Sequence, residues 1–140
     1  MESLSRRVGV VLIGLLLVGY AQAWGADWKY CTSSEFGDYY YDVGSVKGLP
    51  NNIAHVWTQE ISSPKGGMDV VSRLGREYID LKYINTLWEV DCIGKRSRVL
   101  SVVYYSKSRS MISSAHNPSA EWNLIVPDPM LEFLSKVVCK

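Results

Sequence analysis

Short stretches of alternating apolar and polar residues, separated by turn-forming residues, dominate the chain after its first 23 residues. Alternation with a period of two is typical of strands that bury one face. The pattern predicts strands over residues 28–32, 53–61, 83–92, 98–105 and 111–114, and a further strand that begins at residues 39–41. Six strands in succession form a meander, which is within the usual size of one sheet.

Clusters of Gly, Pro, Asn, Asp and Ser mark the turns between these strands. They occupy residues 33–38, 49–52, 94–97 and 107–110, and residues 62–67 form the clearest loop of the chain. Residues 94–97 join two apolar runs, which indicates a β-hairpin. Residues 68–80 fit either a short helix or an irregular crossing, and the sequence leaves both alternatives open.

The last part of the chain predicts a helix. Asp128 has the character of an N-cap and Pro129 that of a first helical residue. Apolar residues then recur at helical spacing toward Cys139, namely Met130, Leu131, Leu134 and Val138. Because a sheet with one apolar face needs a cover, we expect this helix to pack on it. The predicted fold class is therefore α+β, an antiparallel sheet of about six strands packed by a C-terminal helix.

The first 23 residues have the pattern of a secretory signal peptide. Arg6 and Arg7 precede an uncharged apolar run over residues 8–19, and Ala21 and Ala23 form a small-x-small cleavage site. The alternative is an uncleaved membrane anchor, but the uncharged stretch is shorter than the about 20 residues that span a bilayer. We therefore expect a single exported domain over residues 24–140, in the periplasm, at the cell surface or in the medium, without a stable membrane anchor.

The composition permits a folded domain and argues against nucleic acid as a partner. Hydrophobic residues make up 47% of the chain and charged residues 21%, a mixture unlike that of disordered segments. The chain has 15 basic and 14 acidic residues, and removal of residues 1–23 leaves the two in balance. A chain whose basic and acidic residues balance has no extended basic surface to attract the phosphate groups of a nucleic acid.

Export changes the interpretation of the three cysteines, because thiols outside the cytoplasm are readily oxidised. Cys31, Cys92 and Cys139 cannot all pair within one chain. A bridge between Cys92 and Cys139 would fasten the C-terminal tail to the end of an apolar run. Cys31 is then either a partly buried thiol near the start of the first strand, which is the favoured interpretation, or a bridge between two protomers.

No motif for catalysis, for a metal or for a cofactor emerges from the sequence. It contains no Cys-x-x-Cys pair, and neither histidine stands at ligand spacing from a cysteine. His55 could act as a general base with Asp42 or Glu60 and a serine, but a half-exposed strand histidine is favoured. Glu89 and Asp91 share a strand face, where surface ion pairs with Lys or Arg neighbours are expected. We assign no catalytic residue and no cofactor.

Binding of a macromolecule is the stronger function class. Lys95, Arg96 and Arg98 lie at the predicted hairpin tip, where they could contact an acidic protein loop or a sulfated glycan; the alternative is a solvated turn. Aromatic residues could add an exposed contact patch, although core packing takes most of them. One small helix covers only part of the sheet, so we expect a second copy to close the remaining apolar strip or open edge as a homodimer.

Several segments follow one another in the order found in one family of bacterial exported proteins. They are Tyr40-Tyr41-Asp42, Ser45-Val46, Val56-Trp57, Trp88-Glu89-Val90-Asp91-Cys92, Tyr104-Tyr105, Glu121-Trp122 with Ile125 and Pro127, and residues 134–139. In this order they resemble the surface-adhesin protein E family, over residues 40–139. The resemblance implies an antiparallel sheet packed by a C-terminal helix, with Cys92 and Cys139 as the disulfide pair. Cys31 and the lack of a lipid-attachment cysteine depart from the family pattern.

The residues and the resemblance together predict an exported binding protein of the surface-adhesin protein E type. Its partner would be a host or extracellular protein or other macromolecule, contacted through a flat aromatic and basic surface. The alternative is a periplasmic small-ligand-binding or inhibitor-like module without an adhesive role, and an enzyme ranks third. A deep pocket with convergent polar groups would favour the small ligand, and a flat aromatic or basic surface would favour a protein partner.

Overall fold

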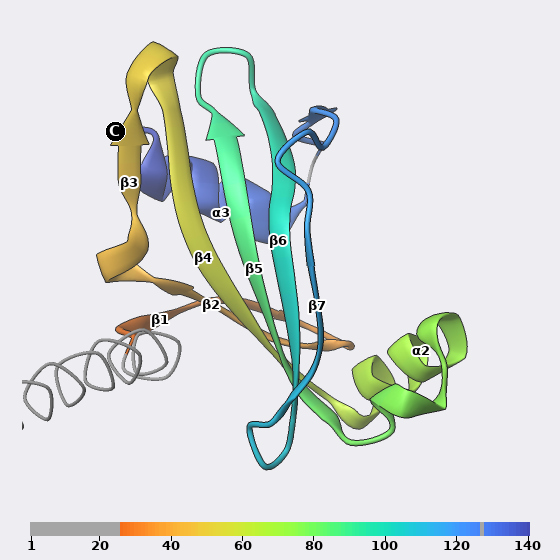
Figure 1. Cartoon of the computed structure of the whole chain (residues 1–140). Coiled ribbons are helices and arrows are strands. Elements are labelled where there is room, and N and C mark those ends of the chain that lie inside the picture. Colours follow the sequence, from red (N-terminus) through yellow and green to blue (C-terminus); the bar gives the residue numbers. More distant parts are fainter. Residues whose placement is uncertain (1–25, 127) are drawn as a thin grey trace, which may run out of the picture.

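The computed structural model describes residues 26–126 and 128–140, and Figure 1 shows them as a curved antiparallel sheet with helices packed beside it. The predicted signal peptide, residues 1–23, lies outside the described residues. None of the helices in the described ranges has the length and hydropathy needed to cross a membrane.

The described residues form an eight-stranded sheet whose main path runs β1-β2-β4-β5-β6-β7 with antiparallel neighbours. These strands are β1 (Trp28–Ser34), β2 (Gly37–Asp42), β4 (Ile53–Ser62), β5 (Leu81–Asp91), β6 (Arg96–Ser106) and β7 (Met111–His116). Off the path, β3 (Lys47–Leu49) pairs with β4, and β8 (Asn123–Leu124) pairs with β6. The α+β class and the six predicted strands are confirmed, whereas β3 and β8 are too short to produce a recognisable period in the sequence.

The C-terminal helix α3 (Pro129–Val138) forms where the sequence predicts it. The Asp128 side chain caps it, since one Oδ1 atom accepts hydrogen bonds from the backbone N–H groups of Met130 (2.9 Å) and Leu131 (3.1 Å). Pro129 occupies the first turn, where no N–H donor is needed. In Figure 1, α3 crosses one face of the sheet at the level of β4, β5 and β6.

The face under α3 carries the main hydrophobic core. Leu134 of α3 and Val56 of β4 are both 0% exposed and pack with Tyr41 of β2. Other partly buried side chains surround them, namely Cys31, Val46, Trp88, Met130, Leu131, Phe133, Val137 and Val138. Full burial of one such aliphatic side chain stabilises the fold by roughly 1.5–3 kcal/mol, so α3 is held chiefly by its apolar face.

The prediction of a loop over residues 62–67 is wrong, because helix α2 (Pro64–Leu74) begins within this segment. Ser63 is the N-cap, and its Oγ accepts a hydrogen bond of 3.1 Å from the backbone N–H of Gly66. Gly66 has a packing reason to lack a side chain, since a Cβ at this position would collide with the carbonyl oxygen of Phe36. The two glycines that suggest a loop therefore belong to a helix that approaches its neighbour closely.

Residues 68–80, left open between a helix and an irregular crossing, contain the rest of α2 and the 3-10 turn η3 (Arg76–Tyr78). Val70 of α2 and Tyr78 of η3 are buried with Leu81 in a second cluster. Ile84 and Tyr104 pack against this cluster from the sheet. Cross-strand pairing places Ile84 opposite Glu60, on the same side of β4 as Val56. Both helices therefore cover one face of the sheet.

The β5–β6 hairpin has its turn at residues 92–95 rather than at the predicted 94–97. Lys95 adopts φ 51, in the left-handed region that tight turns use. Arg96 is consequently the first residue of β6 and lies opposite Asp91 in the ladder. Arg96, which the sequence predicts within the turn, therefore lies in strand β6.

Cys92 and Cys139 form the predicted disulfide, with a Cα–Cα distance of 5.5 Å. The bridge joins the end of β5 to the end of α3. Cys31 is a free, half-buried thiol in β1 that packs against the core beneath α3. Burial raises the pKa of Cys31 to about 11. These surroundings favour the partly buried thiol of the two interpretations given for this residue.

Candidate functional site

The face of the sheet turned away from α3, here called the open face, is not covered by α2 or α3, which both pack on the other face. Side chains alternate along β4, so the odd-numbered residues of this strand point away from the core that contains Val56. The cross-strand pairs that form the centre of the open face are His55–Glu89, Trp57–Leu87 and Gln59–Asn85. Gln59, Asn85 and Glu89 are buried here, so polar side chains occupy positions that apolar residues usually fill, and Gln59 donates a hydrogen bond of 3.0 Å to Asn85.

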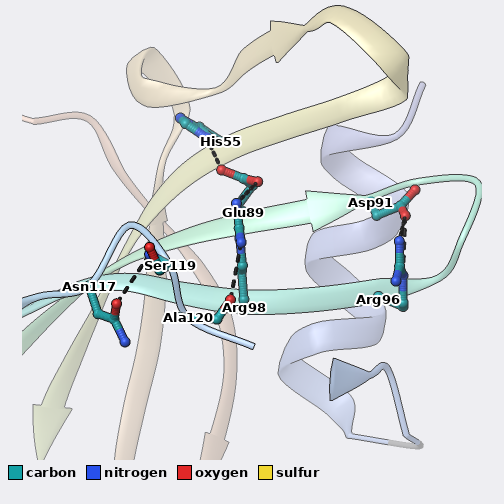
Figure 2. A network of polar contacts seen from close by, with 8 residues as sticks. All are labelled: His55, Glu89, Asp91, Arg96, Arg98, Asn117, Ser119 and Ala120. Atoms are coloured by element: carbon teal, nitrogen blue, oxygen red, sulfur yellow. Dashed lines mark hydrogen bonds and ion pairs between the residues drawn. The ribbon is translucent and has the colours of Figure 1, made fainter. Parts of the chain in front are cut away.

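Glu89 is the centre of a polar network on this face (Figure 2). Its Oε2 atom lies 2.7 Å from His55 Nε2, and its Oε1 atom accepts a hydrogen bond of 2.8 Å from Arg98. A second nitrogen of the same guanidinium donates to the carbonyl oxygen of Ala120 at 3.1 Å. Because Glu89 is only 9% exposed, both of its carboxylate oxygens need these partners.

A second ion pair lies next to the hairpin turn. Arg96 donates to Asp91 Oδ2 at 2.8 Å, and the backbone N–H of Gly94 donates to Oδ1 at 2.8 Å. The Arg96 hydrogen bond, followed by the Gly94 hydrogen bond, lowers the pKa of Asp91. The expected pairing of Glu89 and Asp91 with arginine neighbours is therefore present, but both carboxylates are largely buried and not at the surface.

Trp122 brings the two arginines together. The guanidinium carbon of Arg98 lies 4.4 Å from the centre of the indole ring, and that of Arg96 lies 5.3 Å away. The loop that precedes Trp122 is held to β6 by the hydrogen bond from Asn117 N–H to the Leu100 carbonyl oxygen at 2.8 Å. A cation against an aromatic face at this distance is a favourable electrostatic contact.

Large exposed apolar side chains lie on the segments next to this aromatic–basic group. Ile93 of the hairpin turn is 74% exposed, Leu124 of β8 71% and Val126 61%. The backbone N–H of Ile125 donates to the Lys95 carbonyl oxygen at 2.9 Å, which keeps the segment after Trp122 beside the turn. We call this region the hairpin-end surface and define it by Ile93, Lys95, Arg96, Arg98, Trp122, Leu124 and Val126.

The three cations predicted at the hairpin tip lie close together, but two of them have carboxylate partners. The Arg98 side chain is 20% exposed and the Arg96 side chain 45% exposed, and each forms an ion pair. Lys95 is exposed in the turn. The sequence pattern does not mark Trp122 as a site residue, because its contact with the arginines depends on a chain crossing that no local pattern signals.

His55 is paired with Glu89, and neither Asp42 nor Glu60 is its partner. Glu60 points to the opposite face of β4, and no hydrogen bond joins His55 to a serine in the described parts of the chain. Among the described residues, His55 therefore lacks the hydrogen bonds to Asp42, Glu60 or a serine that the general-base hypothesis requires. The His55 side chain is 25% exposed, which agrees with the half-exposed strand histidine that was favoured.

The open face also contains a pocket of about 770 Å³. Its floor is formed by side chains of β4, β5 and β6, and its wall by the start of β1, the end of β2 and the 3-10 turn η1 (Val43–Ser45). The lining includes Trp28, Trp57, Tyr105, Asn85 and Lys47. Small-molecule sites have volumes of about 300–1,000 Å³, so the pocket has a suitable size for a ligand.

Comparisons with known proteins identify the family. The family model of surface-adhesin protein E matches residues 28–140. The selenomethionine form of protein E from Haemophilus influenzae superposes with a TM-score of 0.50 at 13% identity, covering 79% of this chain and 84% of that chain. Protein E from non-typeable Haemophilus influenzae gives a TM-score of 0.49 at 13% identity, covering 79% and 74% of the two chains. No curated protein matches the sequence.

At 13% identity the structural likeness concerns the fold alone, whereas the family match covers nearly the whole described chain. The family match favours an adhesin over the alternative, a small-ligand-binding or inhibitor-like module. A surface adhesin acts outside the cytoplasm, which agrees with the predicted export. The chain belongs to the surface-adhesin protein E family, and its function is of the surface-adhesin type.

Proposed function

We propose that this chain binds a protein partner outside the cytoplasm through its hairpin-end surface. The observation that carries the proposal is the position of Trp122 against Arg98 and Arg96, with exposed apolar side chains around them. Trp and Arg are enriched in the centres of protein interfaces, and exposed apolar patches mark interaction sites. The surface combines both features.

The charges of this surface favour a protein over a polyanion such as a sulfated glycan. Glu89 and Asp91 pair with Arg98 and Arg96, so these guanidinium groups are partly neutralised before any partner arrives. Lys95 remains as an exposed cation in the turn. The binding free energy comes chiefly from covering Trp122 and its apolar neighbours. An acidic group of the partner lies near Lys95.

The ion pairs contribute by fixing the geometry of the surface. The two carboxylates hold the arginines beneath the indole ring, so the side chains lose little rotamer freedom when a partner binds. Glu89 and Asp91 therefore support the contact without touching the partner. The polar network of Figure 2 is a scaffold for the exposed residues beside it.

The test is a binding assay against purified matrix and serum proteins, by biolayer interferometry with the mature chain. For any protein bound by the wild type, Trp122→Ala should weaken binding by about tenfold or more, as central aromatic residues do. Lys95→Glu should slow association, because rim charges act mainly on the on-rate. Lys107→Glu, an exposed cation in the β6–β7 turn, is the matched control and should leave binding unchanged.

Circular dichroism and thermal melts establish that each variant is folded. Wild-type affinity retained by folded Trp122→Ala and Lys95→Glu would place the contact elsewhere and contradict the proposal. Fractionation of the native host tests export separately, since retention in the cytoplasm excludes an adhesive role. Detection at the outer surface distinguishes a surface location from a periplasmic one.

We also propose that two copies associate through an open sheet edge. In the described residues, β7 pairs with β6 alone and β1 with β2 alone, so each presents an outer edge with backbone groups available for pairing. Met111 at the start of β7 is 60% exposed and adds apolar surface there. Light scattering coupled to gel filtration should give a dimer mass; a monomer across the micromolar range would contradict this.

A further inference from the structure

The pocket on the open face shares no lining residue with the hairpin-end surface, although its His55 and the Arg98 of that surface both contact Glu89. It exists because β2 leaves β4 after pairing Tyr41 with Thr58, and β3 joins β4 again where Lys47 pairs with His55. Between these points the chain makes the η1 turn. This excursion forms a wall beside Trp57 instead of continuing the ladder.

Hydrogen bonds fix the wall in place. Ser45 Oγ accepts from the backbone N–H of Trp57 at 2.9 Å and so satisfies a donor that the strand pairing leaves free. Asp42 Oδ1 accepts from the backbone N–H groups of Gly44 (3.1 Å) and Asp27 (3.2 Å). The backbone N–H of Val43 donates to the Asp27 carbonyl oxygen at 3.0 Å. The wall is therefore preformed, which lowers the entropic cost of binding a ligand.

The lining combines aromatic rings with separated polar groups. Trp28, Trp57 and Tyr105 contribute rings, and Leu87 and Val103 contribute aliphatic surface. The polar groups are Asp27, Asp42, Ser45, Lys47, His55 and Asn85. The indole N–H of Trp28 is buried and has no hydrogen-bond partner among the described residues. Indole and phenol rings offer flat apolar faces beside polar edges.

We propose that this pocket binds a small neutral saccharide. One face of a pyranose ring is a patch of C–H groups that stacks on an indole, and its rim is a circle of hydroxyl groups that need donors and acceptors. The alternation of rings and polar side chains in the pocket meets both requirements. A purely apolar ligand would leave the buried indole N–H of Trp28 without a hydrogen-bond partner.

The charges of the lining select against anionic sugars. Asp27 and Asp42 place two carboxylates in the wall, and Lys47 is the one lysine or arginine side chain in the described lining. A sulfated or phosphorylated ligand would meet more negative than positive charge. This separates the pocket from the hairpin-end surface, where the exposed charge is positive.

The experiment titrates the folded mature chain with two neutral probes, lactose and N,N′-diacetylchitobiose, and with a sulfated heparin disaccharide. Isothermal calorimetry measures affinity, and ¹H–¹⁵N spectra follow the indole N–H signals of the tryptophans. We expect saturable binding of at least one neutral probe in the millimolar range or tighter, with shifts of the Trp28 and Trp57 signals. The two neutral probes distinguish a hexose from an N-acetylhexosamine ligand.

Variants complete the test. Trp57→Ala should weaken binding by at least tenfold, Trp57→Phe should retain part of the affinity through its ring, and Trp122→Ala should bind the saccharide like the wild type. The proposal is overturned if neither neutral probe binds, if the heparin disaccharide binds better, or if only Trp122 shifts. The spectra of the wild type decide the question even if Trp57→Ala fails to fold, and none of these outcomes bears on the protein partner of the hairpin-end surface.

Discussion

Replacement of both bridged cysteines by serine measures what the Cys92–Cys139 disulfide contributes to stability. The bridge closes a segment with a sequence separation of 47 residues. In the loop-entropy description, a loop of this length lowers the entropy of the unfolded chain enough to stabilise the fold by about 4 kcal/mol. Domains of this size have free energies of unfolding of roughly 5–15 kcal/mol, so the double variant should fold but lose a large share of its stability.

Urea unfolding at 25 °C, followed by tryptophan fluorescence and circular dichroism, gives the free energy of unfolding of each variant. We expect the Cys92→Ser/Cys139→Ser variant to lose about 2–4 kcal/mol. Cys31→Ser is the matched control, because it removes a half-buried thiol and leaves the bridge intact. A loss below about 1 kcal/mol in the double variant would contradict the reasoning.

Leu134→Ala tests whether the bridge acts on the unfolded chain or on the docking of α3. Leu134 is 0% exposed, so its truncation should cost about 2–5 kcal/mol in the bridged protein. If the bridge acts mainly on the unfolded chain, the two costs add to within about 0.5 kcal/mol. A cost of Leu134→Ala that disappears in the unbridged background would show that α3 has left the sheet, and would refute the loop-entropy account.

Two further predictions concern partly buried ionisable groups. Because burial raises the pKa of Cys31 to about 11, its thiolate fraction at pH 8 should be roughly 100-fold smaller than that of an ordinary cysteine, and alkylation of the native protein should be slower to a similar degree; modification at the rate of a free thiol would contradict this. Burial raises the pKa of Glu60 against opposing hydrogen bonds from Tyr39 and Ser62. The stability contributed by the protonated carboxyl is therefore present below the unfolded pKa of 4.5 and lost as pH rises through the folded pKa. Glu60→Gln should stabilise the protein more at pH 7 than at pH 4, as judged from urea midpoints, and the reverse order would refute the assignment.

The sheet and the last helix could be predicted because local patterns encode them. The alternation of apolar and polar residues along 53–61 and 83–92 indicates a strand regardless of which strands pair with it. Asp128 and Pro129 mark the start of α3. The start of α2 was missed because residues 62–67 are rich in Ser, Pro and Gly. Ser63 and Pro64 also form a helix start signal, but the reason for Gly66 is the carbonyl of Phe36, which lies far away in the sequence.

The candidate sites depend more strongly on long-range contacts. The sequence indicated Lys95, Arg96 and Arg98 as cations near a turn, but their partners follow from the register that places Asp91 opposite Arg96. A turn two residues later would have left Arg96 outside the ladder. The pocket combines residues from 26 to 105, and no single segment contains enough of its lining to reveal it.

The disulfide connects the stability of the fold with the geometry of the hairpin-end surface. Cys92 is the first residue of the turn that carries Ile93 and Lys95, and its bridge to Cys139 fixes this turn to the end of α3. Reduction therefore loosens both the cover of the core and one side of the proposed protein contact. The pocket wall contains no cysteine and is held by the hydrogen bonds of Asp42 and Ser45. Reductant should therefore weaken protein binding more than saccharide binding, provided that the domain stays folded.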